Sequence, residues 1–490
     1  MRMRRLLCAA GALAIPVSAY AHGFGRLYNL PVPFWLYAWA AGAALVLSFL
    51  LIAWFATAPP APASSAARDI SNTWCVRALR WVRPLLRTLA VSALLLCMAT
   101  GWWGSVDPYR NFSMTSFWIV FVLGCTYLTA LSGNFYAALN PWKTLADGIA
   151  RRWARYAQGR VRYAESLGDW PALALYLGFV WFELFNHGYP STLAWMLFAY
   201  SLLNLAGVWW VGAPAWFAHC EFFSVFLRLV GVMAPLDYQP GYQPGAPHGT
   251  LRWRLPLSGV MHERPAHLST VIFALAMLST TAFDGLRATQ WWVGLVWRDP
   301  TGWLTALLGT KPIMVYPMLR PWYIAWESFW LLASPFIYAA AYCTALLAGK
   351  LLTRSARPLR ELLLDFGYTL LPIALVYNLA HYSTLVLGQG MKIISLLSDP
   401  FGRGWNLFGT AHLLRAPILP GMGIVWHSQV LLILLGHVLG VYAAHRVALR
   451  VWPSRGAALA SQLPMLLLML ALTVSGLWIL AQPLTDLLMR

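Results

Sequence analysis

Charged side chains are scarce in this chain of 490 residues, where Asp, Glu, Lys and Arg together make up 10% of the sequence. A soluble domain carries about 25% charged residues, so the composition excludes an ordinary water-soluble fold. Hydrophobic residues instead reach 60%, and many apolar segments have the roughly 20 residues needed to cross a bilayer. The sequence therefore predicts an all-α, polytopic integral membrane protein.

Disulfide-forming cysteines and local catalytic motifs are also lacking. Six cysteines are present, but none lies in a segment predicted to face outward, so no disulfide is expected. The sequence contains no CxxC pair, no HExxH, no P-loop and no GxSxG elbow. Any active site must therefore be assembled from residues on different helices.

The first 21 residues have a basic start, an apolar run and an Ala19-Tyr20-Ala21 end. This pattern is typical of a cleaved secretory signal peptide, and it leaves residues 22–490 as a single helical membrane domain. Cleavage would make His22 the mature N-terminus, where its amine and ring could bind one copper or zinc ion together. The alternative is that cleavage simply falls beside a histidine.

About ten membrane-spanning helices are expected. They lie at 34–56, 86–103, 116–138, 171–187, 192–212, 267–283, 322–347, 362–388, 424–445 and 463–482. With His22 outside, the inner loops and their flanks hold 22 of the 35 Lys and Arg residues, and the outer segments hold 10. This bias predicts a multi-pass protein of the bacterial inner membrane with a periplasmic mature N-terminus. Because the positive charge lies in short loops on one side, we expect contact with membrane lipid and no nucleic-acid binding.

Two segments do not fit a plain span. Residues 213–266 are expected to form a cytoplasmic loop with an interfacial helix around 222–232, followed by a Pro/Gly-rich stretch. Residues 284–321 form a Trp-rich periplasmic segment, predicted to lie on the membrane as a lid. An ordinary aromatic belt at the membrane interface is the alternative.

Ionisable side chains gather at the outer level of several predicted spans, and such groups inside a membrane are candidates for function. Glu183 and His187 share one face of the fourth span because they are one turn apart. Histidine and carboxylate side chains are the usual ligands of zinc and similar ions. The predicted ligands of a zinc or copper ion are His22, Glu183, His187, His381, His427 and His437, with Asp284 and Glu327 as catalytic residues. The alternative for His381 is a packing histidine bonded to a neighbouring helix.

Four stretches of the mature chain carry a resemblance to known proteins. They are HGFGRLYNLPVPFWLY (22–37), LSGNFYAALNPWK (131–143), AHYSTLVLGQG (380–390) and GHVLGVYAAHRVAL (436–449). Together they resemble a family of bacterial multi-spanning membrane proteins, the fenitrothion hydrolases. The resemblance implies a membrane-bound hydrolase that splits the aryl ester of a phosphorothioate, a small hydrophobic substrate, and it brings no catalytic residues with it.

The residues by themselves are compatible with that activity, because a metal-bound hydroxide facing the periplasm could attack phosphorus. Two other functions fit the same histidines. In a copper-type metal permease, His22, His381 and His437 would line a path across the membrane. In a haem b electron-transfer protein, His381 and His437 would be the axial ligands.

Overall fold

The structure is a computed structural model, and it describes residues 32–58, 67–186, 188–239, 249–416 and 420–482. The predicted all-α class is confirmed, since 77% of the described residues are helical. Within the described ranges, nine helical segments are long and apolar enough to cross a membrane. The predicted signal peptide and His22 lie outside the described residues.

The nine segments coincide with nine of the predicted spans. A long apolar stretch becomes a helix in lipid because only a helix satisfies all of its backbone hydrogen bonds internally. One of the nine segments consists of three consecutive helices, α5 (Phe112–Met114), η2 (Thr115–Gly124) and α6 (Cys125–Ser132). The other eight contain α2 (Phe34–Phe55), α4 (Trp74–Trp103), α10 (Pro190–Val211), α14 (Leu268–Arg287), α17 (Tyr316–Leu352), α19 (Leu371–Gln389), α21 (Met422–Val451) and α22 (Arg455–Ala481). The remaining predicted span corresponds to α9 (Trp170–Asn186), whose 17 residues reach only about 25 Å.

Shorter elements connect these helices. They are α7 (Tyr136–Leu139), α8 (Pro141–Arg152), η3 (Ala154–Tyr156), η4 (Glu165–Leu167), α11 (Ala213–Ala215), η5 (Trp216–Cys220), α12 (Phe222–Gly231), α13 (Ser258–His262), α15 (Gln290–Trp297), α16 (Trp303–Leu308), η6 (Pro312–Val315), α18 (Leu359–Phe366), η7 (Gly367–Leu370), η8 (Gly390–Lys392) and α20 (Ile393–Ser398).

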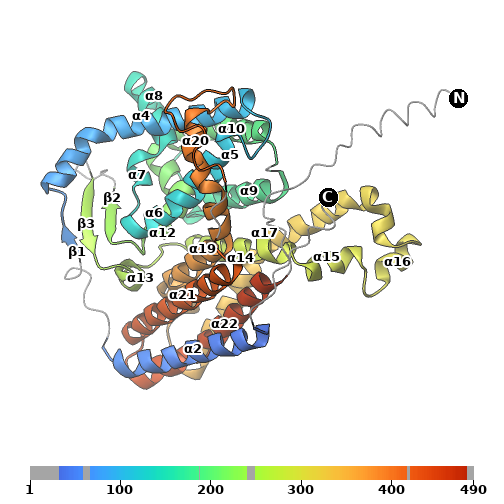
Figure 1. The fold of residues 1–490 in the computed structure, drawn as a ribbon. Helices are drawn as coiled ribbons and strands as arrows, with labels where there is room; N and C mark the ends of the chain where they lie inside the picture. The colour runs from blue at the N-terminus through green and yellow to red at the C-terminus, as the bar shows by residue number, and fades with distance from the viewer. Residues whose placement is uncertain (1–31, 59–66, 187, 240–248, 417–419, 483–490) are drawn as a thin grey trace.

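Helix α14 lies at the centre of the fold. In its most apolar stretch, 89% of the residues are buried by the rest of the protein. Figure 1 shows it between one group of helices that includes α4, α6, α9, α10 and α12 and a second group that contains α2, α19, α21 and α22. Helices α9, α17, α19 and α22 all pack against it. A polar residue on α14 is therefore surrounded by protein and not by lipid.

The segment 213–266 differs from the predicted interfacial helix and loop. Helix α12 is buried, with Phe222 and Phe223 packed in an aromatic cluster with residues of α9 and α10. After it come strands β2 (Leu236–Gln239) and β3 (Thr250–Arg254), and β3 also pairs with β1 (Ala67–Asp69) in an antiparallel sheet of order β1-β3-β2. These strands were not predicted, because each has five residues or fewer and such short stretches give a weak periodic signal.

The Trp-rich segment forms α15 and α16 and packs along the first half of α17. Trp292 stacks on Trp326 with ring centroids 4.5 Å apart, and Trp297 contacts Tyr316 and Tyr323. In Figure 1 this segment extends from the body on the side away from α19 and α21. The tryptophans therefore pack against the start of α17 and stabilise it.

Candidate functional site

Two of the predicted site residues, Asp284 and His381, form a buried pair. Asp284 lies in the last turn of α14, and His381 lies in the middle of α19. Nε2 of His381 is 3.0 Å from Oδ2 of Asp284, and their side chains are 12% and 7% exposed. The two residues are separated by 97 positions in the chain, so only the packing of α14 against α19 brings them together.

Further polar groups surround this pair. The hydroxyl of Tyr382 donates a hydrogen bond of 2.9 Å to the same oxygen of Asp284. Glu183 of α9 approaches both the Tyr382 hydroxyl and the Asp284 carboxylate. Three helices thus contribute two carboxylates, one imidazole and one phenol to a single cluster, which we call the His381 cluster: Glu183, Asp284, His381 and Tyr382.

Glu327 lies in a different buried ion pair. Its carboxylate is 3.1 Å from Nη2 of Arg287 and accepts a hydrogen bond of 3.3 Å from Nε1 of Trp292. Arg287 also donates to the Leu184 carbonyl at 2.9 Å. Through these contacts the ion pair connects the ends of α9 and α14 with α15 and α17. Arg287 lies three residues beyond Asp284 on α14.

His427 and His437 lie on α21 and do not join the His381 cluster. His427 is exposed and faces α2, where Nε2 is 3.4 Å from the Tyr37 hydroxyl. His437 is buried, and its Nδ1 is 2.8 Å from the Ile433 carbonyl. Because α21 runs antiparallel to α19, with Gly436 facing Val376 and Gly440 facing Ile373, His437 lies about 9 Å along the helix axis from His381.

The predicted metal site depends partly on residues that the structure leaves out. His22 and His187 both lie outside the described residues. Among the residues that are described, no group of three or more His, Cys, Asp or Glu side chains is arranged to hold a metal ion. In the His381 cluster, the oxygen of Asp284 nearest to the imidazole accepts hydrogen bonds from His381 and Tyr382. These residues alone therefore do not fit a resident ion.

A second carboxylate–imidazole pair was not predicted. Asp169, just before α9, is 2.8 Å from Nδ1 of His219 and 3.1 Å from Nη2 of Arg228, and it accepts a hydrogen bond of 2.6 Å from Thr270. Burial alone would raise the pKa of the Asp169 carboxyl, but these hydrogen bonds and the guanidinium charge lower it below its ordinary value. Asp169 and His219 are 50 positions apart in the chain, so only the packing of the helices brings them together.

Glu221 is a fully buried carboxylate that was not predicted as a site residue. It caps the start of α12 by accepting from the backbone N–H groups of Phe223 and Ser224, and the Tyr200 hydroxyl donates to it at 2.6 Å. Asn140 donates to it at 3.1 Å. Burial raises the pKa of Glu221 above its ordinary value. The stretch 131–143, which carries part of the family resemblance, thus supplies a partner for this carboxylate.

Comparison with known proteins gives no relative for this chain: no family model matches it, and no curated protein or solved structure is significantly similar to it.

Proposed function

We propose that this protein is a membrane-bound hydrolase of organophosphorus esters, in particular phosphorothioate aryl esters, with the His381 cluster as its reactive centre. The observation that carries the proposal is the buried Asp284–His381 pair, held at 3.0 Å by two helices far apart in sequence. A carboxylate that orients an imidazole is the usual arrangement for a general base. The resemblance to the fenitrothion hydrolases supplies the substrate class.

In the proposed reaction, the imidazole of His381 removes a proton from water. With a proton on Nε2 donated to Asp284, the lone pair of the neutral ring lies on Nδ1, which is the atom that accepts the proton of water. The water oxygen forms a bond to phosphorus as the bond from phosphorus to the aryl oxygen breaks, and the aryloxide leaves with the electron pair. Asp284 stabilises the imidazolium, and Tyr382 holds Asp284 in place.

No step above uses a metal ion. The sequence predicts a zinc or copper ion with Glu183 and His381 among its ligands, together with His22, His187, His427 and His437, and it predicts Asp284 as a catalytic residue. The ion would need His187, one turn beyond Glu183, or His22 to complete the ligand set. We also propose that the protein lies in the bacterial inner membrane, with the His381 cluster near the periplasmic face.

The experiment is a hydrolysis assay on detergent-purified protein with an aryl phosphorothioate whose phenol product is coloured. Removal of a general base lowers kcat by about 10²–10⁴-fold, so we expect this loss in His381→Ala and a comparable loss in Asp284→Asn. His427→Ala is the matched control, because its exposed ring faces α2. A folded His381→Ala variant with wild-type activity would refute the proposal. Assays after chelation, and again after zinc or copper is restored, test metal dependence separately.

A second candidate is a metal permease, and His437 is the observation that favours it. Its Nε2 is buried and has no hydrogen-bond partner among the described residues, an energetically costly state that a transported ion would relieve. Metal uptake into vesicles that is lost in His437→Ala would support this function, and it requires no hydrolysis. The haem b alternative predicts a Soret band in the purified protein.

A further inference from the structure

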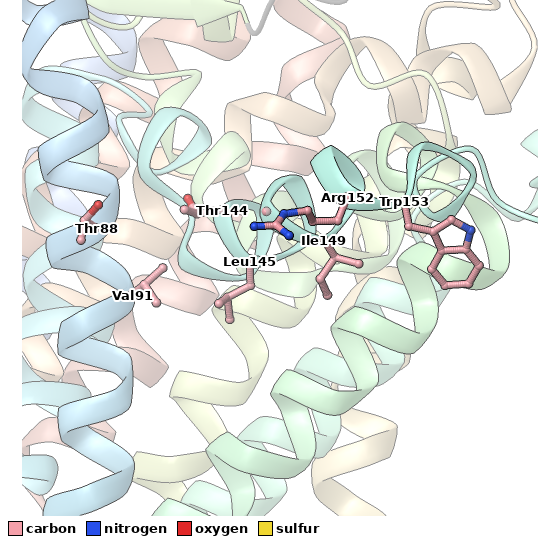
Figure 2. Close-up of a pocket in the computed structure, with 8 residues that line it drawn as sticks. Thr88, Val91, Thr144, Leu145, Ile149, Arg152 and Trp153 are labelled. Carbon is pink, nitrogen blue, oxygen red and sulfur yellow. The ribbon is translucent and has the colours of Figure 1, made fainter.

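A cavity of about 540 Å³ opens on the surface between α4 and α8, and none of its lining residues belongs to the His381 cluster. Its walls are mainly apolar, with Val91 of α4 opposite Leu145 and Ile149 of α8. Figure 2 shows these side chains on the two helices, with Arg152 from the end of α8 turned toward Thr144. The cavity thus combines an apolar wall with one cationic group.

The charge around the cavity is positive. Among the residues that line it, Arg152 is the charged one, and its side chain is exposed. The nearest carboxylate on α8, Asp147, is outside the lining and lies 3.4 Å from Nη1 of Arg87. The lining threonines already donate their hydroxyl hydrogens to backbone carbonyls of their own helices. Arg152 is therefore the group that would recognise an anion.

The level of the cavity along α4 matches a membrane boundary. The first half of this helix contains four arginines, Arg77, Arg80, Arg83 and Arg87. From Thr88 to Trp103 the helix carries no charged residue. Thr88 and Val91, which line the cavity, lie in the first turn after the last arginine. Helix α8 likewise ends with Arg151 and Arg152. The cavity therefore lies where a basic surface gives way to an apolar one.

We propose that this cavity binds an anionic phospholipid of the surrounding bilayer, with the phosphate at Arg152 and an acyl chain along Val91, Leu145 and Ile149. Basic pockets between helices at this level are suited to anionic head groups. A free phosphate ion would use the cation but leave the apolar wall uncovered, whereas a phospholipid covers both. The site is independent of the proposed hydrolase activity.

Three single substitutions test the proposal. Arg152→Gln removes the cation from the cavity, and Arg151→Gln removes the same charge one residue away, outside the lining. Gly148 lines the cavity, and a Cβ added there meets no atom within 4 Å. Gly148→Leu should therefore fill the cavity without disturbing α8, and the loss of a helical glycine favours the helix by up to about 1 kcal/mol.

The measurement is lipid binding to the delipidated full-length protein in detergent, by native mass spectrometry, with phosphatidylglycerol, phosphatidylcholine or inorganic phosphate as the probe. We expect phosphatidylglycerol to bind more tightly than phosphatidylcholine. Arg152→Gln should weaken phosphatidylglycerol binding about fivefold, which corresponds to about 1 kcal/mol for one basic residue. Gly148→Leu should abolish this binding, and Arg151→Gln should leave it unchanged.

Three results would overturn the proposal. Equal binding of the two lipids would mean that no anionic head group is recognised, and equal weakening by Arg151→Gln and Arg152→Gln would indicate a general surface attraction. Inorganic phosphate that competes fully with the lipid and binds Gly148→Leu normally would make the site one for a free ion. Circular dichroism of each variant confirms that the helices are retained.

Discussion

The buried pair of Arg287 and Glu327 gives the most direct test of the packing around the candidate site. Glu327 and Arg287 have side chains that are 3% and 14% exposed, so solvent screens their interaction little. Replacing one partner of a buried pair costs about 3–5 kcal/mol, because the other charge remains buried and unpaired. We therefore expect Glu327→Leu to lower the free energy of unfolding by about 3–5 kcal/mol.

Replacing both partners should cost less stability than the two single changes added together. The double variant Arg287→Met/Glu327→Leu buries no unpaired charge. Its remaining cost is that the Leu184 carbonyl loses the hydrogen bond from Arg287 and the Trp292 indole N–H loses its acceptor on Glu327, a penalty of about 1–3 kcal/mol for each group. The two single changes should thus be strongly non-additive. Arg298→Met is the control, because it removes an exposed cation of the same segment and should change stability by less than about 0.5 kcal/mol.

The assay is SDS-induced unfolding in mixed micelles followed by circular dichroism, with hydrolysis measured on the same samples. If Glu327 positions helices, Glu327→Gln should lower stability while activity per folded molecule persists. If Glu327 is catalytic, as the sequence predicts, activity should fall in the folded fraction. A double variant that loses as much stability as the two single variants added together would refute the electrostatic reasoning.

Two further predictions concern stability. Gly436→Ala should cost about 1–3 kcal/mol by overpacking, because the added Cβ would lie 1.9 Å from Cγ2 of Val376. Gly423→Ala on the same helix meets no atom within 4 Å and should be neutral or stabilising in the same unfolding assay. Since the pKa of Asp169 is lowered in the folded protein, its contribution should be present above about pH 4, the pKa of an unfolded Asp, and lost as the pH falls further. Thermal stability measured from pH 6 to pH 3 should therefore fall more steeply in the wild type than in Asp169→Asn.

The membrane helices could be predicted from the sequence, because a long apolar segment in lipid satisfies its own backbone hydrogen bonds by forming a helix. The convergence of Asp284 and His381 also followed from their shared depth on two predicted spans. Depth did not predict the direction in which a side chain faces around its helix. His427 lies near the same level as His381 but faces α2, and Glu327 faces Arg287, one of the few arginines predicted to lie on the outer side.

Elements outside the spans could not be predicted in the same way. The three strands are short, and the pairing of β1 with β3 joins residues about 180 positions apart, such as Asp69 and Arg252. The burial of α12 depends on Glu221, whose donors come from separate helices. Neither pairing has a local pattern in the sequence, so both depend on tertiary structure.

The spacing of three polar residues, one just before α9 and two on it, connects the Asp169–His219 pair with the His381 cluster. Asp169, Tyr176 and Glu183 are seven residues apart, and two turns of helix place them on one face at intervals of about 10 Å. That face contacts α14 throughout: a threonine of α14 bonds to Asp169, the Tyr176 hydroxyl is 3.0 Å from Oγ1 of Thr280, and Glu183 approaches Asp284. A polar face on an otherwise apolar helix must be covered by protein, because lipid offers no hydrogen bonds. The spacing therefore indicates that α9 needs a polar partner helix, and α14, the most buried of the spans, provides it.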